Sequence, residues 1–335
     1  MKYYNIPVFV PHLGCPFDCV FCNQRKITGA DSNITGEDVK SIVEEHLKLL
    51  PKENAEIEIA FFGGSFTGIA EELQEELLYS AYSYVQKTNI SGIRVSTRPD
   101  YINHAVLKRL LKYGATSIEL GVQSMDSEVL LRCARGHSAE DVEKAVELIK
   151  QYPFKLGLQM MTGLPGDSDE KCLETADKII GLKPDFVRIY PTLVIKGTQL
   201  FEMYKEGSYA PQEVEDAVNL CTKLVKRFHK SGIEVIRTGL QNTEEISPGA
   251  SVMAGPYHSA FGELVESQIY FEKIAEEIPK INSDEIVAFV NPGEISKAVG
   301  HKKINSKKVF NEFGKKLKVT GDNSLKKGEI IIKGR

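Results

Sequence analysis

Three cysteines lie within eight residues of one another, in the stretch Gly14-Cys15-Pro16-Phe17-Asp18-Cys19-Val20-Phe21-Cys22-Asn23. Thiolates are soft ligands that favour zinc, Cu(I) and iron–sulfur clusters. A structural zinc ion usually takes four ligands from paired knuckles, and no second cysteine pair occurs in the chain. Three close thiolates without a fourth indicate a 4Fe–4S cluster with one iron left open for a ligand. A zinc site completed by His12 is the alternative.

The cysteine stretch follows the first of six short apolar runs, each of which leads into a loop and a helical pattern. The runs are Ile6–Val10, Ile57–Phe62, Gly92–Thr97, Ser117–Gly121, Phe154–Met161 and Phe186–Tyr190. Repeated strand–helix units predict a parallel sheet, and continuous apolar runs predict strands covered on both faces. In such sheets the chemistry gathers at the C-terminal ends of the strands. An open doubly wound sheet and a partial barrel both fit this pattern.

Composition excludes several classes of protein. The chain has 335 residues, of which 42% are hydrophobic and 26% charged, which is typical of a globular protein and not of a disordered or fibrous one. Six cysteines are too few for a disulfide framework and favour a reducing compartment. We find neither a signal-peptide pattern nor an apolar run long enough to span a membrane. We therefore expect a cytoplasmic protein with no membrane partner.

Charge is distributed unevenly along the chain. Residues 299–335 carry 11 Lys or Arg and 3 Asp or Glu, a net charge of +8, whereas residues 1–298 carry −12. This asymmetry favours a polyanionic partner for the C-terminal end. We expect three segments: a barrel at residues 1–235, a connecting segment at 236–283 and a small basic α+β module at 284–335.

The cysteine spacing resembles the signature of the radical S-adenosylmethionine (SAM) superfamily, with aromatic Phe21 directly before the last cysteine. The resemblance implies an α/β fold, a partial (β/α)6 barrel with a C-terminal α+β extension. It also implies a 4Fe–4S cluster on Cys15, Cys19 and Cys22 and bound SAM, whose amino and carboxylate groups would chelate the open iron. One-electron reduction would then cleave SAM to a 5′-deoxyadenosyl radical.

The same resemblance assigns SAM contacts to the ends of successive strands. Gly63-Gly64-Ser65 is similar to the family's Gly-Gly-Glu element, with Ser in place of Glu, and Ser96 stands where the family places polar groups near the ribose. The interval from Gln123 to Arg135 resembles that of oxygen-independent coproporphyrinogen oxidases, which have Asp where Gln159 stands here. The predicted SAM contacts are Gly63, Gly64, Ser65, Ser96, Gln123, Arg135, Gln159 and Gly163, the last near the adenine.

Residues 187–209 closely resemble the catalytic subunit of Elongator, a tRNA wobble-uridine modifying enzyme, and this resemblance extends over about residues 5–235. We see no glycine-rich acetyl-CoA loop, so acetyl transfer is not implied. The chain is expected to be a short bacterial relative that modifies RNA, most plausibly tRNA. Tyr190, at the end of the sixth run, is expected to line the site. His258 is expected to contact substrate or donate a proton, with a turn-capping histidine as the alternative.

The C-terminal module is predicted as strand, helix, loop, helix, strand, which resembles a minimal KH RNA-binding unit. KH domains clamp single-stranded RNA with a Gly-x-x-Gly loop, and the loop Gly300-His301-Lys302-Lys303 has Lys at the last position. A plain accessory fold with a basic face is the alternative. Expected partners are RNA, through this module, and a reductase, ferredoxin or flavodoxin that supplies electrons.

Two other functions remain open at this point. One is a radical SAM enzyme acting on a small, tetrapyrrole-like molecule. The other is a non-catalytic RNA-binding protein with a structural cluster.

Overall fold

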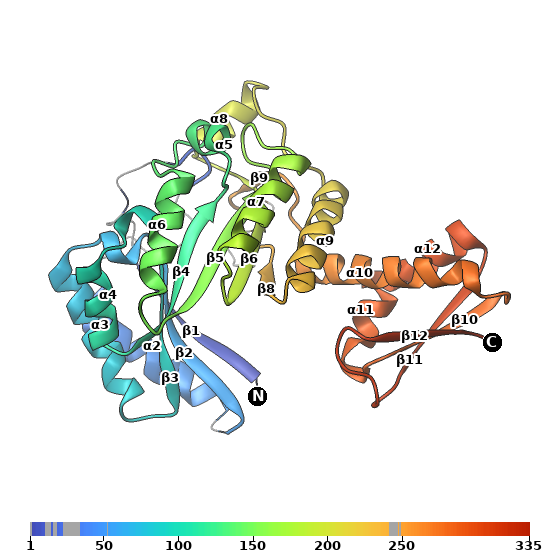
Figure 1. The fold of residues 1–335 in the computed structure, drawn as a ribbon, viewed down its shortest axis with the longest axis horizontal. Helices are drawn as coiled ribbons and strands as arrows, with labels where there is room; N and C mark the ends of the chain where they lie inside the picture. The colour runs from blue at the N-terminus through green and yellow to red at the C-terminus, as the bar shows by residue number, and fades with distance from the viewer. Residues whose placement is uncertain are drawn as a thin grey trace.

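The computed structural model describes residues 2–10, 15, 19–22, 34–51, 53–240, 247 and 249–335. Its main body is one sheet of seven parallel strands that curls into a half-barrel (Figure 1). In spatial order the strands are β1 (Lys2–Val10), β2 (Ala55–Gly63), β3 (Ile90–Thr97), β4 (Ala115–Gln123), β5 (Lys155–Thr162), β6 (Phe186–Pro191) and β8 (Glu234–Thr238). Of the two sheets that fitted the sequence pattern, the structure confirms the partial barrel and not the open doubly wound sheet. All six predicted runs form strands, and β8 adds a seventh beside β6.

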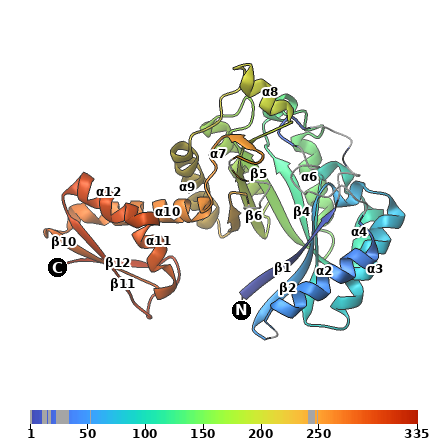
Figure 2. The ribbon, with the colours of Figure 1, turned by 180° about the vertical axis from the view of Figure 1, so that it is seen from behind.

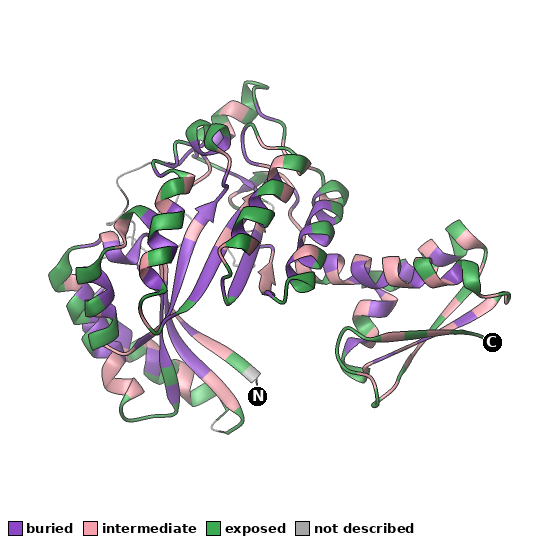
Figure 3. Cartoon of the chain, viewed as in Figure 1, coloured by how far each residue is buried: buried purple, intermediate pink, exposed green. Residues whose placement is uncertain are grey.

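Helices cover the convex face of the half-barrel (Figures 1 and 2). They are α2 (Gly36–Leu49), α3 (Glu71–Val85), α4 (His104–Lys112), α6 (Ala139–Ile149), α7 (Asp169–Gly181) and α9 (Val214–Lys230). Several begin at a residue whose side chain accepts a backbone N–H of the first turn, such as Asn103 and Ser168. The central strands β2 to β6 are buried over most of their length (Figure 3), as their continuous apolar runs predicted.

Short elements cap the C-terminal edge of the sheet. They are α5 (Ser127–Arg132), α8 (Gln199–Lys205) and the antiparallel pair of β7 (Val194–Ile195) with β9 (Val252–Ala254). The sequence patterns did not predict β7, α8 or β9. A two-residue strand and a three-residue strand are too short to show a period, so only their tertiary pairing reveals them.

Helix α10 (Phe261–Glu277) leads from the half-barrel to a second unit (Figure 2). Val265 and Ile269 pack into the core of the half-barrel. Phe271 and Ile274, further along the same helix, pack into a separate core in the C-terminal unit. One continuous helix therefore contributes to both cores.

The C-terminal unit contains a three-stranded sheet in the order β11 (Lys316–Gly321), β10 (Glu285–Val290), β12 (Ile330–Gly334). Strand β10 pairs parallel with β11 and antiparallel with β12. The helices α11 (Ile295–Val299) and α12 (Ile304–Phe313) complete the predicted order of elements. Among the described residues, no helix is both long and apolar enough to cross a membrane.

Candidate functional site

The cysteine stretch is anchored at the C-terminal edge of the half-barrel. The N–H of Val20 donates to the carbonyl of Cys133 at 3.1 Å, and the N–H of Leu200 donates to the carbonyl of Val20 at 2.7 Å. The N–H of Cys22 donates to the carbonyl of Cys19 at 2.9 Å, which closes a tight turn. The loop is therefore held between α5 and α8, with its thiols at the mouth of the half-barrel.

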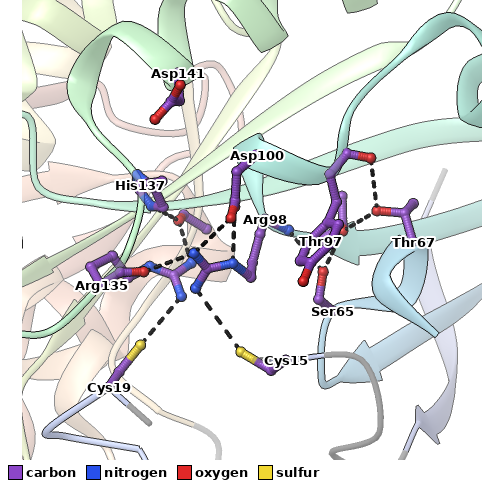
Figure 4. Close-up of polar contacts among 12 residues, drawn as sticks. Cys15, Cys19, Ser65, Thr67, Thr97, Arg98, Asp100, Arg135, His137 and Asp141 are labelled. Carbon is purple, nitrogen blue, oxygen red and sulfur yellow. Dashed lines mark hydrogen bonds and ion pairs between the residues drawn. The ribbon is translucent and has the colours of Figure 1, made fainter. Parts of the chain in front are cut away.

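Two buried arginines face two of the predicted cluster thiols (Figure 4). Nη1 of Arg98 lies 4.0 Å from Sγ of Cys15, and Nη1 of Arg135 lies 3.6 Å from Sγ of Cys19. A guanidinium stays protonated even when it is buried, so each thiol has a permanent positive charge beside it. Positive charge beside the sulfurs suits an anionic metal cluster.

Arg98 is held rigidly in this position. Its Nε and Nη2 donate to the two carboxylate oxygens of Asp100 at 2.9 and 3.0 Å. Its Nη2 also donates to the carbonyl of Arg135 at 2.8 Å, which links the two arginines. Burial opposes the charge of Arg98, but Asp100 and then the sulfurs of Cys15 and Cys19 outweigh burial and raise its pKa.

Arg135 reaches the end of β4. Its Nη2 donates to the carbonyl of Gly121 at 2.7 Å, while its Nε is buried without a hydrogen-bond partner in the described chain. A Cβ on Gly121 would lie 2.9 Å from this Nη2, so glycine leaves room for the guanidinium. The unpaired Nε is a donor that an anionic ligand would satisfy.

His137 lies behind this pair. Its Nε2 is 3.3 Å from the carbonyl of Gly121. Burial, followed by the positive charge of Arg135, lowers the pKa of His137 to about 4. His137 is therefore neutral near pH 7, and the positive charge of the site comes from the two arginines.

The predicted SAM contacts on β2 and β3 lie at the same edge of the sheet. Gly63 ends β2 with φ of 104°, a conformation that favours glycine, and the N–H of Gly64 donates to the carbonyl of Val10 at 3.2 Å. The hydroxyl of Ser65 is occupied, because it pairs with Oγ1 of Thr97 at 2.8 Å. By contrast, Oγ of Ser96 is buried without a partner in the described chain.

The two glutamines meet across β4 and β5. Nε2 of Gln159 donates to Oε1 of Gln123 at 3.1 Å. Gln123 has φ of 68°, a conformation that costs a non-glycine residue free energy and that is found most often at functional sites. The predicted contacts Gln123, Arg135 and Gln159 are thus brought together at the ends of neighbouring strands.

Gly163 lies to one side of this group, at the end of β5. Its φ is 70°, its N–H donates to Asp167 at 3.1 Å, and its carbonyl accepts from Tyr209 at 2.6 Å. It borders a cavity of about 580 Å³ that Arg132 and Gln212 also line. None of the cluster cysteines lines this cavity, so we place the site at the thiol–arginine group and not at this cavity.

The two residues predicted to meet substrate belong to different elements. Tyr190 ends β6, and its hydroxyl accepts from Nη1 of Arg188 at 3.1 Å. His258 lies in the loop before α10 and borders a small pocket with Leu193 and Leu240. In the described chain no hydrogen bond joins His258 to Tyr190, and the ring of His258 instead contacts His301.

Sequence reasoning missed a row of charged side chains on the face of the sheet that the helices do not cover. Arg94 pairs with Glu58 at 3.0 Å, and Arg188 pairs with Glu119 at 3.1 Å. Charged residues inside apolar strands were the available signal, since a buried charge requires a partner. Arg98 was also missed, although Arg94, Ser96 and Arg98 alternate onto one face.

The residues around the thiols suit an anionic iron–sulfur cluster. In the part of the chain that the structure describes, no three His, Cys, Asp or Glu side chains gather around one point as a single ion would require. A 4Fe–4S cluster does not require this, because each thiolate binds a different iron. His12, the alternative zinc ligand, lies outside the described residues. Two thiols beside two guanidiniums, with spare donors on Arg135 and Ser96, suit an anionic cluster and a carboxylate ligand.

Comparisons with known proteins agree with this geometry. The radical SAM superfamily matches residues 9–179, and the Radical_SAM C-terminal domain matches residues 184–270. The tRNA uridine(34) acetyltransferase of Methanocaldococcus jannaschii is 32% identical over 249 residues, 68% of this chain and 44% of that protein. Human Elongator complex protein 3 is 32% identical over 201 residues, 54% of this chain and 37% of that protein.

A solved structure resembles most of the fold. The archaeal Elongator protein of Methanocaldococcus infernus, with an N-terminal deletion, superposes with a TM-score of 0.64 at 28% identity and covers 82% of this chain and 63% of that one. The alignments span less than half the length of the curated relatives named above. The radical SAM family model matches half of this chain, and the relatives found are named for tRNA uridine modification. The chain therefore belongs to the radical SAM superfamily of enzymes.

Proposed function

We propose that the chain binds a 4Fe–4S cluster through Cys15, Cys19 and Cys22 and uses it with SAM as a radical enzyme. The observation that carries this proposal is the pair of buried guanidiniums facing the thiols of Cys15 and Cys19. When bound, the cluster and SAM would supply a 5′-deoxyadenosyl radical by reductive cleavage.

The chain's own residues would bind and orient the cofactor. Nε of Arg135, which is buried without a partner among the described residues, would donate to an anionic group such as the carboxylate of SAM. The Gln123–Gln159 pair and the hydroxyl of Ser96 would hold the ribose. The backbone of Gly63 and Gly64, with Ser65 beside it, and that of Gly163 would border the two ends of SAM.

The uncovered face of the sheet would position the substrate. The Glu119–Arg188 ion pair holds the guanidinium that donates to Tyr190, so the phenol has one orientation at the end of β6. Because this row of charges is buried and paired, it would also keep bulk water out of the interior. His258 borders a small pocket with Pro191, the residue after Tyr190, and would contact the substrate from the same side of the mouth.

We propose RNA, and tRNA in particular, as the substrate. The curated relatives carry the names tRNA uridine(34) acetyltransferase and Elongator complex protein 3. The net charge of +8 over residues 299–335 supports contact between the C-terminal module and RNA. In this proposal the catalytic barrel extends past the predicted residue 235 to Thr238, where β8 ends, a connecting segment follows up to residue 283, and residues 284–335 bind RNA. A reductase, ferredoxin or flavodoxin in the cytoplasm would supply the electron.

The test is release of 5′-deoxyadenosine by anaerobically reconstituted protein given SAM and dithionite, with and without bulk tRNA. We expect release that tRNA stimulates. If tRNA does not change the release of 5′-deoxyadenosine, the proposal of an RNA substrate is contradicted and a small-molecule substrate is favoured. No release from protein with a full cluster would overturn the catalytic function. Cys19→Ala is expected to abolish release while leaving RNA binding in place.

A further inference from the structure

The loop between α11 and α12 meets the mouth of the half-barrel. The rings of His258 and His301 make an edge-to-face contact with centroids 5.3 Å apart. His258 belongs to the loop that borders the ends of β6 and β8, with Pro191 and Leu240 in the same small pocket. A segment of the C-terminal unit is therefore part of the rim around the candidate site, although the two units have separate cores.

Contacts along α10 hold this loop in place. Nδ2 of Asn305 donates to the carbonyls of Ser267 and Ala298 at 2.8 and 3.0 Å. Nζ of Lys308 donates to Gln268 at 2.9 Å. Since α10 also packs into the barrel core, the start of α12 keeps a constant position relative to the rim.

Two groups of lysines in the C-terminal unit differ in exposure. Lys308 and Lys315 are partly buried and donate to groups within the unit, so they stabilise its fold. Lys302, Lys303 and Lys307 are exposed, and none of them forms a salt bridge in the described chain. The second group therefore presents three positive charges to solvent beside the rim.

The backbone and an aromatic ring add to this surface. Lys302 and Lys303 have φ of 52° and 59°, in the left-handed region that non-glycine residues avoid, and such outliers are common at ligand clamps. Phe310 is 56% exposed. It follows Lys307 by three residues, which places the two on one face of α12, and Lys303 directly precedes that helix.

We propose that His301, Lys302, Lys303, Lys307 and Phe310, together with the His258 loop, bind one single-stranded RNA segment and lead it into the mouth between β6 and β8. This inference rests on the proposed function and names the path of its substrate. Lysines neutralise phosphates, and an exposed ring stacks on a base without selecting its sequence. The body of the protein, with a net charge of −12 over residues 1–298, would repel RNA elsewhere.

The binding test uses the full reconstituted chain and fluorescein-labelled oligouridine, read by anisotropy over a range of salt concentrations. The double variant K302E/K303E is expected to bind about tenfold more weakly or worse, and the slope of log K against log salt should fall by about 1.4, about 0.7 for each lost phosphate contact. The matched control is K316E/K318E, which makes the same charge change on β11. Leu317 and Val319 pack into the unit's core, so Lys316 and Lys318 point to the opposite face of the sheet. Equal weakening by both variants would mean that only net charge matters and would overturn the proposal.

Phe310 is tested separately. Phe310→Ala is expected to weaken oligouridine binding by about tenfold, because stacking on one base is lost. Leu131→Ala removes another strongly exposed apolar side chain, on α5, and is expected to leave binding unchanged. Two outcomes would contradict the role of Phe310: both variants bind oligouridine as the wild type does, or both bind it more weakly.

Cross-linking tests the path across the two units. Oligouridine carrying 4-thiouridine should cross-link to peptides from both 255–262 and 300–310. Cross-links from only one of them would overturn a shared binding surface. SAM cleavage separates this inference from the proposed function. If the wild-type chain with a full cluster releases no 5′-deoxyadenosine either with or without bulk tRNA, the proposed function fails, whereas the binding and cross-linking results still decide the RNA path.

Discussion

Arg98 and Arg135 decide the electrostatics of the candidate site. Each lies close to one cysteine sulfur, and the two are joined by the hydrogen bond from Arg98 to the carbonyl of Arg135. Burying a charge costs free energy unless an opposite charge lies beside it. Asp100 is that partner for Arg98 but not for Arg135. The guanidinium of Arg135 instead faces a sulfur and a carbonyl, and its Nε–H has no partner among the described residues, as expected of a residue that binds an anionic ligand.

We predict that Arg98→Gln lowers the reduction potential of the reconstituted cluster by about 60 mV or more, the one-electron equivalent of about 1.4 kcal/mol. A nearby positive charge stabilises the reduced form, so its removal makes reduction harder. The measurement is a redox titration monitored by electron paramagnetic resonance. Arg98→Lys keeps the charge and should shift the potential less, and equal shifts in both variants would show that charge is not the cause.

His137 predicts a pH dependence of stability. Its pKa of about 4 in the folded chain lies below the ordinary value of 6.5, so the unfolded chain binds this proton more tightly. Stability contributed by neutral His137 is complete above pH 6.5 and is lost as the pH falls from 6.5 toward 4. Between pH 7 and pH 5 the loss amounts to about 2 kcal/mol.

The measurement for His137 is denaturant unfolding at both pH values for the wild type and for His137→Gln. Between pH 7 and pH 5 the free energy of unfolding should fall by about 2 kcal/mol less in the variant than in the wild type. An identical pH dependence in the two proteins would contradict a depressed pKa of His137.

At the scale of elements, the parallel strands bring the site together by ending at one edge of the sheet. The ends of β2, β3, β4 and β5 supply Gly64, Ser96, Gln123 and Gly163, which are far apart in the sequence. Hydrogen bonds between neighbouring strand ends hold these ends together, such as the one between Oγ of Ser65 and Oγ1 of Thr97 at 2.8 Å. Glycine is needed where a guanidinium passes close to a strand, and Gly121 on β4 is such a position.

We predict that Gly121→Ala weakens SAM binding about tenfold while the melting temperature changes little. The new Cβ would lie 2.9 Å from the ends of the Arg135 and Gln123 side chains, which are flexible and would move away from their present partners. Equilibrium dialysis of reconstituted protein measures the effect. Gly181→Ala on α7 has nothing within 4 Å of its new Cβ and should bind SAM as the wild type does. Loss of stability without loss of SAM affinity in Gly121→Ala would contradict the prediction.

At the scale of the whole molecule, α10 connects two hydrophobic cores. Ile274 is fully buried in the core of the C-terminal unit, and Ile118 is fully buried in that of the half-barrel. Separate cores favour separate unfolding units, and this division is the physical basis of the proposed three segments. The rim contact between His258 and His301 is then a contact between units that fold around different cores.

We predict two calorimetric unfolding transitions. Ile274→Ala should lower the melting temperature of the C-terminal unit by about 10 °C or more, since removing a buried isoleucine costs about 2 kcal/mol or more in a small domain. The transition of the half-barrel should shift much less. Ile118→Ala should have the reverse effect. A single transition that moves equally in both variants would show that α10 makes the chain one cooperative unit.

The sequence by itself determined the elements of this protein. Six apolar runs became six strands, and the order of elements in the C-terminal unit was predicted, because strand and helix periods are properties of neighbouring residues. The cysteine spacing and the glycines at strand ends also pointed to the family that the comparisons confirm. These features are local, so they can be read without knowing how the chain packs.

Only the tertiary structure decided which distant residues meet. Sequence periodicity does not predict which distant residues make contact. The contacts of Arg98 with Cys15, of Arg135 with Cys19 and of His258 with His301 depend on strand register, on sheet curvature and on the direction of α10. For the same reason the sequence did not predict that β8 would join the sheet beside β6 or that β7 and β9 would pair. Charge and spacing along the chain select the kinds of residue that a site needs, but long-range packing assembles them into one place.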